Sequence, residues 1–358
     1  MNQTATPPAS VHLVGAIGLD TVAETFETLG RLLGRRLRRV PDGEPGGRRM
    51  WIAWQFPLLR ANPFLKAVAP PPGASAINFP LMALADDVKP EQLRFCELGY
   101  SREAYASYAD FKKAKNAGIL PADVRFQVTL PTPYAVVSAF CARADQPVIE
   151  IAYEKAMMRE VATICATIPH NELTIQWDVC PEMIVWDGRL ERVKNAFKDP
   201  QTEILSRMRR LSMAVPSDVE LGFHLCYGDV DAKHFIEPQD AGKLVEFANA
   251  LAHNVGRPIA YIHMPVPIDR TDDAFFKPLA ELKLPSGTEL YLGCVHAADG
   301  AAGTQRRIDA AHKYVTEFGV ATECGMGRCK TPEVVSQLLQ IHAACTVEAG
   351  PAQRSAAR

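Results

Sequence analysis

Two residue types that suit zinc stand one position apart in the segment His224-Leu225-Cys226. On a β-strand, alternate side chains point to the same face, so an imidazole and a thiol at this spacing can reach one ion. Zinc is commonly held by imidazole nitrogen and thiolate sulfur. A hydrogen-bonded histidine beside a buried cysteine would explain the pair equally well, so a third ligand has to decide.

Polar residues also close several other apolar segments that we expect to be strands. They are Asp42-Gly-Glu44, Gln176-Trp-Asp178, His263, His296 and Glu323-Cys324. In a barrel of parallel strands, all such ends meet at one rim. Cys324 can then supply a second thiolate across the mouth. We therefore predict that His224, Cys226 and Cys324 hold a catalytic zinc ion.

The elements that must position these residues are short apolar segments alternating with helical patterns, which is typical of βα units. We expect strands at 11–17, 37–40, 124–130, 172–177, 219–226, 258–263, 289–295 and 319–322. We expect helices at 21–34, 147–166, 238–253, 303–318 and 332–345, several of them opened by proline. The count of strands predicts the α/β class and a (β/α)8 TIM barrel.

The organisation that we predict is a single barrel over residues 11–347. Residues 62–120 form an insertion over the barrel after the second βα unit, with an extra strand near 93–98. Residues 1–10 and 348–358 are expected to be disordered tails. A length of 358 residues with 47% hydrophobic content suits one such domain.

Composition narrows the partners. The net charge of −2 gives no sign of a nucleic acid or an anionic membrane surface. No apolar stretch approaches the roughly 20 residues that span a bilayer, and no signal-peptide pattern is seen. Nine cysteines in apolar segments are typical of reduced thiols. We expect a cytoplasmic protein with small-molecule partners, and we allow for a homodimer.

Six short motifs occur in a fixed order over residues 11–345. They are Val14-Gly-Ala-Ile-Gly18, Val128-Thr129, Ile175-Gln-Trp-Asp178, His224-Leu-Cys-Tyr227, Cys294-Val-His296 and Glu323-Cys-Gly325. With them the chain resembles the catalytic, C-terminal barrel of cobalamin-independent methionine synthase, in the superfamily that includes uroporphyrinogen decarboxylase and single-barrel relatives. The resemblance implies zinc at His224, Cys226 and Cys324 that binds a substrate thiol as thiolate, the nucleophilic form.

The resemblance also implies roles for single residues. His263 falls where the family has a glutamate ligand, so it is the predicted fourth ligand, with Glu323 as its rival. His296 takes the place of a general acid that protonates the departing group. Asp178 matches the aspartate that holds the amino group of homocysteine. The family's following glutamate is replaced by Val179 here, and Glu182 is the candidate substitute.

Further substrate-binding candidates come from the rim and the loops. Asp42 and Glu44 could orient a polar substrate or act as a base, although a turn with an N-cap explains them equally well. Gly18 could admit a ligand close to the backbone. The segment that ends at Tyr134 lacks the tryptophan with which the family stacks its pterin, which favours another alkyl donor.

The sequence therefore predicts zinc-dependent transfer of a methyl or alkyl group to a small thiol of the homocysteine type. Two alternatives remain open. One is a metal-independent lyase or decarboxylase in which Asp42 or Asp178 is the charged catalytic group. The other is a non-catalytic barrel in which zinc only fixes loops.

Overall fold

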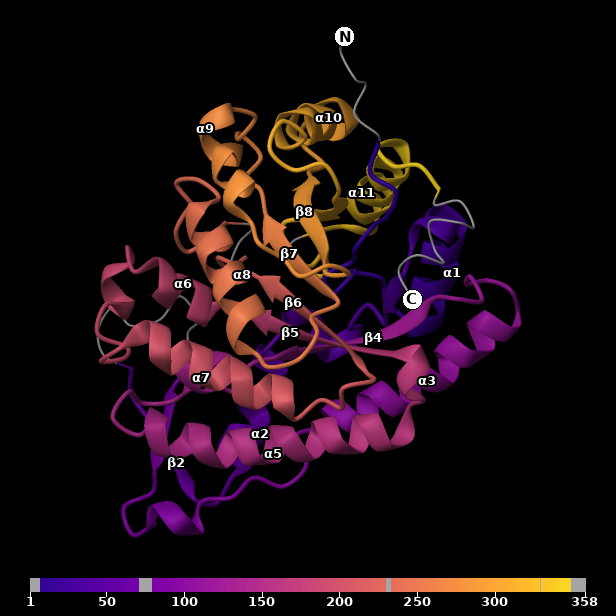
Figure 1. Ribbon diagram of the computed structural model, residues 1–358. Coiled ribbons are helices and arrows are strands. Elements are labelled where there is room, and N and C mark those ends of the chain that lie inside the picture. The colour runs from indigo at the N-terminus through magenta and orange to yellow at the C-terminus, as the bar shows by residue number, and fades with distance from the viewer. Residues whose placement is uncertain (1–6, 71–78, 230–232, 329, 349–358) are drawn as a thin grey trace.

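The computed structural model describes residues 7–70, 79–229, 233–328 and 330–348. Its main sheet has seven parallel strands in the order β1-β4-β5-β6-β7-β8-β9. Their bounds are β1 (Arg39–Pro41), β4 (Arg125–Pro131), β5 (Leu173–Val179), β6 (Glu220–Leu225), β7 (Tyr261–Pro265), β8 (Glu289–Val295) and β9 (Gly319–Thr322). The sheet is curled, and Figure 1 shows its strands running through the middle of the molecule. Seven of the eight expected strands are thus present.

The segment 11–17, expected as the first strand, is not a strand. It makes only isolated parallel bridges, from Val11 to Leu37 and to Val320, and from Ala16 to Gly43. It therefore lies between the two edge strands of the sheet, β1 and β9. The carbonyls of Leu13 and Val14 accept hydrogen bonds from glutamine side chains of β4 and β5, which replace a regular ladder. Closure into an eight-stranded barrel stays a prediction.

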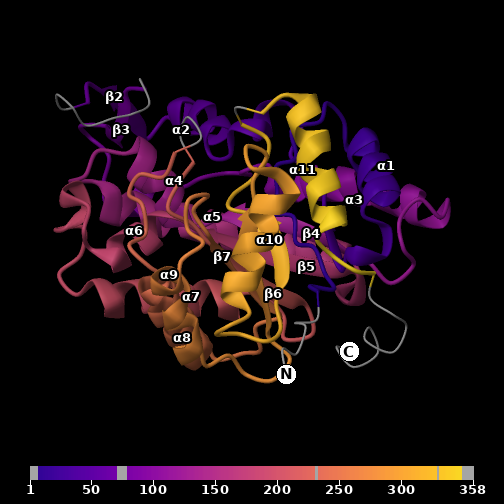
Figure 2. The ribbon, with the colours of Figure 1, turned by 90° about the horizontal axis from the view of Figure 1, so that it is seen from above.

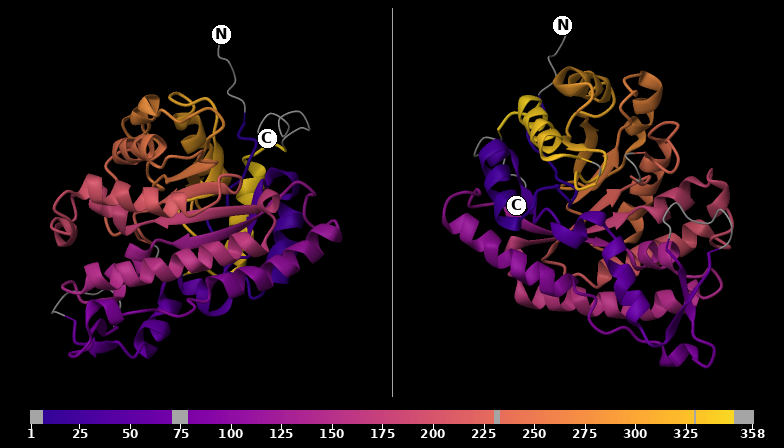
Figure 3. Two further views of the ribbon diagram at one scale, coloured as in Figure 1. Left: turned by 60° about the horizontal axis from the view of Figure 1, so that its bottom comes forward. Right: turned by 180° about the vertical axis from the view of Figure 1, so that it is seen from behind.

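Helices surround the curled sheet. They are α1 (Val22–Leu32), α2 (Phe56–Ala61), α3 (Tyr100–Asn116), α4 (Pro133–Phe140), α5 (Gln146–Thr167), α6 (Pro181–Asp187), α7 (Pro200–Met213), α8 (Gly242–Asn254), α9 (Asp273–Phe276), α10 (Gly300–Ala311) and α11 (Pro332–Ala344). Among them, α1 packs against both α3 and α11, so the first and last helices are neighbours. The helices lie outside the strands in the views of Figures 2 and 3.

Residues 62–120 differ in detail from the expectation. An antiparallel hairpin forms from β2 (Leu65–Val68) and β3 (Leu81–Leu84), at the periphery beside α2 (Figures 1 and 2). No strand forms at 93–98, because side chains take its backbone groups: Glu160 accepts from Leu98 N, and Arg159 donates to Phe95 O. The long α3 that ends this region packs against α1 and α5.

The ends of the chain are only partly described. Most of the two predicted tails, 1–6 and 349–358, lies outside the described residues. The carbonyls of Pro8 and Ser10 are described, and they accept hydrogen bonds from Val347 and Val320. No helix in the described part of the chain is both long and apolar enough to cross a membrane.

Candidate metal centre

The three predicted zinc ligands come together at the C-terminal end of the sheet. His224 is on β6, Cys226 directly follows that strand, and Cys324 follows β9. One ligand atom from each lies within 4.8 Å of the other two. The two Sγ atoms are 3.7 Å apart. Residues a hundred positions apart thus form one compact group of an imidazole and two thiols, which we call the ligand trio.

The donor set fits zinc. Two sulfurs bound at about 2.3 Å to a tetrahedral zinc ion would lie about 3.8 Å apart, close to the distance between Cys226 and Cys324. His224 is 1% exposed, and its Nε2 has no hydrogen-bond partner. A buried nitrogen without a partner is costly, and a metal bond would satisfy it. His224, Cys226 and Cys324 are the residues that would hold the ion.

His263, the predicted fourth ligand, contacts His224. The Nδ1 atoms of the two rings are 2.6 Å apart, and His263 is not part of the ligand trio. Burial lowers the pKa of His263 to about 3, so its ring is neutral near pH 7. For Nε2 of His224 to bind a metal, the proton must be on Nδ1, and His263 can accept it there. Its role as a ligand stays a prediction.

Strand register explains why these residues meet. In the parallel ladders, Asp178 of β5 pairs with His224 of β6, and His224 pairs with His263 of β7. Paired residues on neighbouring strands of a parallel sheet point to the same face. One level of the inner face therefore carries a carboxyl and two imidazoles side by side, all of them buried.

Asp178 is held from two sides. Its Oδ1 accepts from Gln176 Nε2 at 2.9 Å and its Oδ2 from Trp51 Nε1 at 3.0 Å. Burial raises the pKa of Asp178 to about 7 despite these two hydrogen bonds. Trp51 has φ 54° and ψ −107°, a backbone conformation that costs energy and is often found at functional sites. Sequence reasoning missed this contact, since nothing in the motif links Trp51 to Asp178.

Asp42 and Glu44 have different roles in the structure. Asp42 accepts from Glu44 N, Arg48 Nη1 and Ser107 Oγ, so both its oxygens are engaged and it organises the loop. Glu44 has a φ of 49°. Burial raises the pKa of Glu44 well above its usual range, and the negative charges of Asp178 and Asp42 add to the effect. Glu44 and Asp178 thus form a pair of coupled carboxyl groups.

Two glycines shape the same region. A Cβ atom on Gly15 would lie 2.7 Å from Glu44 Oε1, so only glycine leaves room for that carboxyl group. Gly18 has φ 91°, and a Cβ there would lie 2.9 Å from the carbonyl oxygen of Met326. Gly18 is therefore packed against the loop that follows β9. Its predicted contact with a ligand is untested.

His296 faces a cavity of about 500 Å³ whose lining also includes Cys324, Glu323 and His234. Its Nε2 is 2.9 Å from the carbonyl oxygen of Val266, which can only accept, so Nε2 carries the proton. Burial, with help from the charge of Arg307, lowers the pKa of His296 to about 4. The neutral ring then presents a free Nδ1, 3.7 Å from Glu323 Oε2.

His234 is a residue that sequence reasoning missed. Its Nδ1 is 2.8 Å from Glu237 Oε2, and its Nε2 is 3.7 Å from Glu323 Oε1. Glu323 therefore lies between two imidazoles. His234 belongs to a loop with no strand-end signal, so no pattern in the sequence could have indicated it.

Tyr134 and Glu182 form a second group. Tyr134 on α4 stacks near Phe197, with ring centres 5.0 Å apart, and Arg207 lies over its ring. Glu182 on α6 is fully buried, which raises its pKa to about 7. The charges that act on both residues are those of Glu150 and Arg207 from α5 and α7. Their described contacts do not include the ligand trio, and their role in substrate binding stays a prediction.

Comparisons with known proteins place the fold. Neither the models of known protein families nor the curated proteins gave a match to the sequence. Three solved structures are similar over almost the whole chain. They are a putative vitamin B12-independent methionine synthase from Listeria monocytogenes (12% identity, TM-score 0.55, 94% of this chain and 96% of that one), a B12-independent methionine synthase from Shewanella sp. W3-18-1 (15%, 0.57, 95% and 95%) and a methyltransferase from Methanosarcina mazei (12%, 0.51, 95% and 94%).

The class of fold is therefore that of B12-independent methionine synthases and a related methyltransferase, as the motifs indicated. At 12–15% identity the likeness shows the fold alone. The chemistry has to be argued from this chain's own residues.

Proposed function

We propose that the protein is a zinc-dependent transferase that moves a methyl or other alkyl group onto a small thiol of the homocysteine type. The observation that carries the proposal is the ligand trio, His224, Cys226 and Cys324, with its unpartnered imidazole nitrogen and its two adjacent sulfurs. A bound zinc ion keeps a substrate thiol deprotonated and nucleophilic at neutral pH. Three protein ligands leave one position for that thiol.

Glu44 and Asp178 suit the substrate's amino group. Burial and mutual repulsion raise the pKa of Glu44, and burial raises that of Asp178, so both carboxyl groups gain from a cation between them. Asp178 pairs directly with the zinc ligand His224 across the β5–β6 ladder. The two carboxyl groups would therefore orient an amino thiol with its sulfur toward the ligand trio. The Shewanella protein was solved with selenomethionine, an amino acid of matching shape.

His296 suits the donor side. It opens onto the cavity beside Cys324, and its Nε2 is fixed by the Val266 carbonyl. Nδ1 is therefore the atom that can hold a proton for the departing group. The cavity of about 500 Å³ is large enough for a small organic donor.

Metal analysis of the purified protein tests the proposal. We expect about one zinc per chain in the native protein and in Cys165→Ser, a control at a buried cysteine on α5. Cys226→Ser should hold less than about half of that amount. The proposal is wrong if the native protein holds as little zinc as Cys226→Ser.

A cobalt-substituted sample then tests thiol binding. Titration with homocysteine, coenzyme M, glutathione and cysteine should produce a thiolate-to-cobalt band with the true substrate class. Homocysteine should bind far more weakly in Glu44→Gln if this carboxyl group receives the amine, whereas coenzyme M, which has no amino group, should be unaffected. If no thiol alters the spectrum, the metal serves only to fix loops.

A further inference from the structure

A third sulfur lies beside the ligand trio. Cys180 directly follows β5, as Cys226 directly follows β6. The two strands pair Asp178 with His224 and Val179 with Leu225, and Cys226 N donates to Val179 O at 3.1 Å. The next residues along both strands are Cys180 and Cys226. This register places Cys180 on the face that carries Asp178 and His224.

The Cys180 sulfur is in contact with the metal centre. Its thiol is hydrogen-bonded with that of Cys226, which in turn lies 3.7 Å from the sulfur of Cys324. Cys180 is 2% exposed and forms the N-cap of α6. Three buried sulfurs therefore come from the ends of three different strands. Cys180 is not one of the trio whose ligand atoms all lie within 4.8 Å of one another.

The other candidates for a fourth ligand are already engaged. His263 faces Nδ1 of His224. Glu323 points its two oxygens toward His234 and His296. Among the described residues near the trio, the Cys180 sulfur is the soft donor that remains, and zinc accepts three thiolates and one imidazole as readily as two of each.

We propose that Cys180 is the fourth, exchangeable ligand of this zinc site, and that the substrate thiol takes its place. The inference rests on the proposed function, since it assumes that the trio binds zinc. In the exchange, one zinc–sulfur bond breaks and another forms. The departing Cys180 sulfur takes up the proton that the incoming thiol loses, so the charge of the centre does not change. The pocket thereby keeps three sulfurs on the metal before and after the substrate binds.

X-ray absorption at the zinc edge counts the sulfurs directly. We expect three sulfurs and one nitrogen in the native protein and in the control Cys165→Ser, and two sulfurs in Cys180→Ser. Homocysteine should leave the native count at three and raise that of Cys180→Ser from two to three. In the cobalt-substituted proteins, the thiolate-to-cobalt band of Cys180→Ser should be weaker by about one third before homocysteine is added, since one of three thiolates is lost.

The possible failures can be told apart. A native protein that binds one zinc through two sulfurs, with no change in Cys180→Ser, overturns the role of Cys180 and leaves the proposed function intact. A native protein without stoichiometric zinc overturns both. If Cys180→Ser does not fold, the native count of two or three sulfurs still decides, with Cys180→Ala as the second variant.

Discussion

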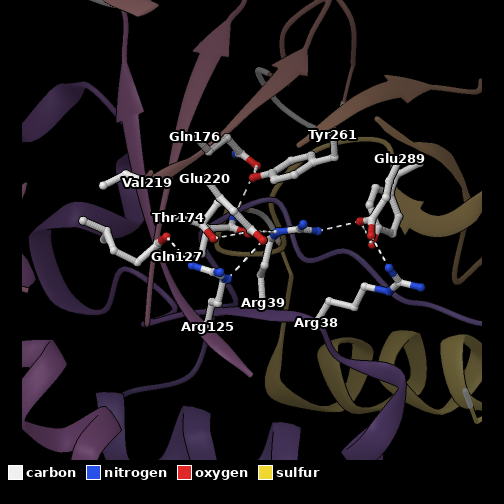
Figure 4. A network of polar contacts seen from close by, with 12 residues as sticks. Arg38, Arg39, Arg125, Gln127, Thr174, Gln176, Val219, Glu220, Tyr261 and Glu289 are labelled. Carbon is white, nitrogen blue, oxygen red and sulfur yellow. Dashed lines mark hydrogen bonds and ion pairs between the residues drawn. The ribbon is translucent and has the colours of Figure 1, made fainter. Parts of the chain in front are cut away.

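The two ends of the curled sheet use buried polar groups in opposite ways. At the N-terminal end, Arg39 lies between Glu220 and Glu289, 2.6 Å from each, and Arg125 and Arg38 complete the network (Figure 4). Each charge there has a partner of opposite sign. We call this network the floor.

At the C-terminal end, which we call the mouth, several groups lack such partners. His224 Nε2 and one oxygen of Glu323 are buried without a hydrogen bond, and the sulfurs of the trio face one another. Folding alone disfavours such an arrangement, because buried polar groups that stay unpaired cost free energy. The difference teaches that the floor serves stability and that the mouth is built to receive something else. Each prediction below separates the two.

The largest effect is expected at the floor. Arg39→Met would leave the carboxylates of Glu220 and Glu289 buried without their shared partner, which should lower the free energy of unfolding by about 3–5 kcal/mol. Urea unfolding followed by circular dichroism measures this. Zinc content of the folded fraction should not change, because the floor does not contact the trio.

Arg36→Met is the matched control. Arg36 pairs with Glu348, whose side chain is 52% exposed. Loss of such a surface pair should cost about 0–1 kcal/mol. Equal losses from Arg36→Met and Arg39→Met would contradict the stabilising role of the floor.

Sequence patterns captured most of this arrangement. Strand ends are visible as apolar runs closed by polar residues, and the fixed geometry of parallel strands then brings His224, Cys226 and Cys324 together. The segment 11–17 looked like the other strands, but Gln127 and Gln176 reach across the interior to its carbonyls. Long-range side-chain contacts of this kind leave no local pattern.

The same limit applies to the residues that sequence reasoning missed. Trp51 and His234 lie on loops, and each reaches the site through one contact, with Asp178 and toward Glu323 respectively. Loop conformation depends on tertiary contacts rather than on periodicity. Cys180 was visible as a strand-end residue, yet only the register of β5 with β6 shows that it neighbours Cys226.

A second prediction sharpens the description of the mouth. His263→Phe keeps a ring of similar size but removes the acceptor for His224 Nδ1. Loss of such an outer partner typically weakens metal binding by about 10–100-fold, and competition with a chromophoric chelator measures it. A loss as complete as that in Cys226→Ser would instead make His263 a direct ligand.

His12→Phe is the control for ring packing. His12 lies in the same buried cluster, with its ring centre 5.5 Å from that of His263. It makes no described hydrogen bond with His224. Zinc affinity should therefore stay near the native value in His12→Phe, and a drop equal to that of His263→Phe would assign the effect to packing alone.

The smallest effect concerns acid. Burial acts to raise the pKa of Glu220, but Arg39 and then Arg125 hold it below its ordinary value. A carboxyl group with a lowered pKa in the folded state contributes stability above its unfolded pKa of about 4.3. That contribution is lost as the pH falls through the folded pKa. The free energy of unfolding should therefore decrease from pH 5 to pH 3 in the native protein.

Glu220→Gln removes this titration, so its unfolding free energy should be lower than the native value at pH 6 and should fall less steeply with acid. The comparison needs urea melts at each pH, because the slope rather than one value carries the prediction. Parallel slopes for the two proteins would show that Glu220 does not report on the floor. The acid sensitivity of the fold would then have to come from other carboxyl groups, such as Glu289, whose pKa Arg39 and Arg38 also lower against the opposing effect of burial.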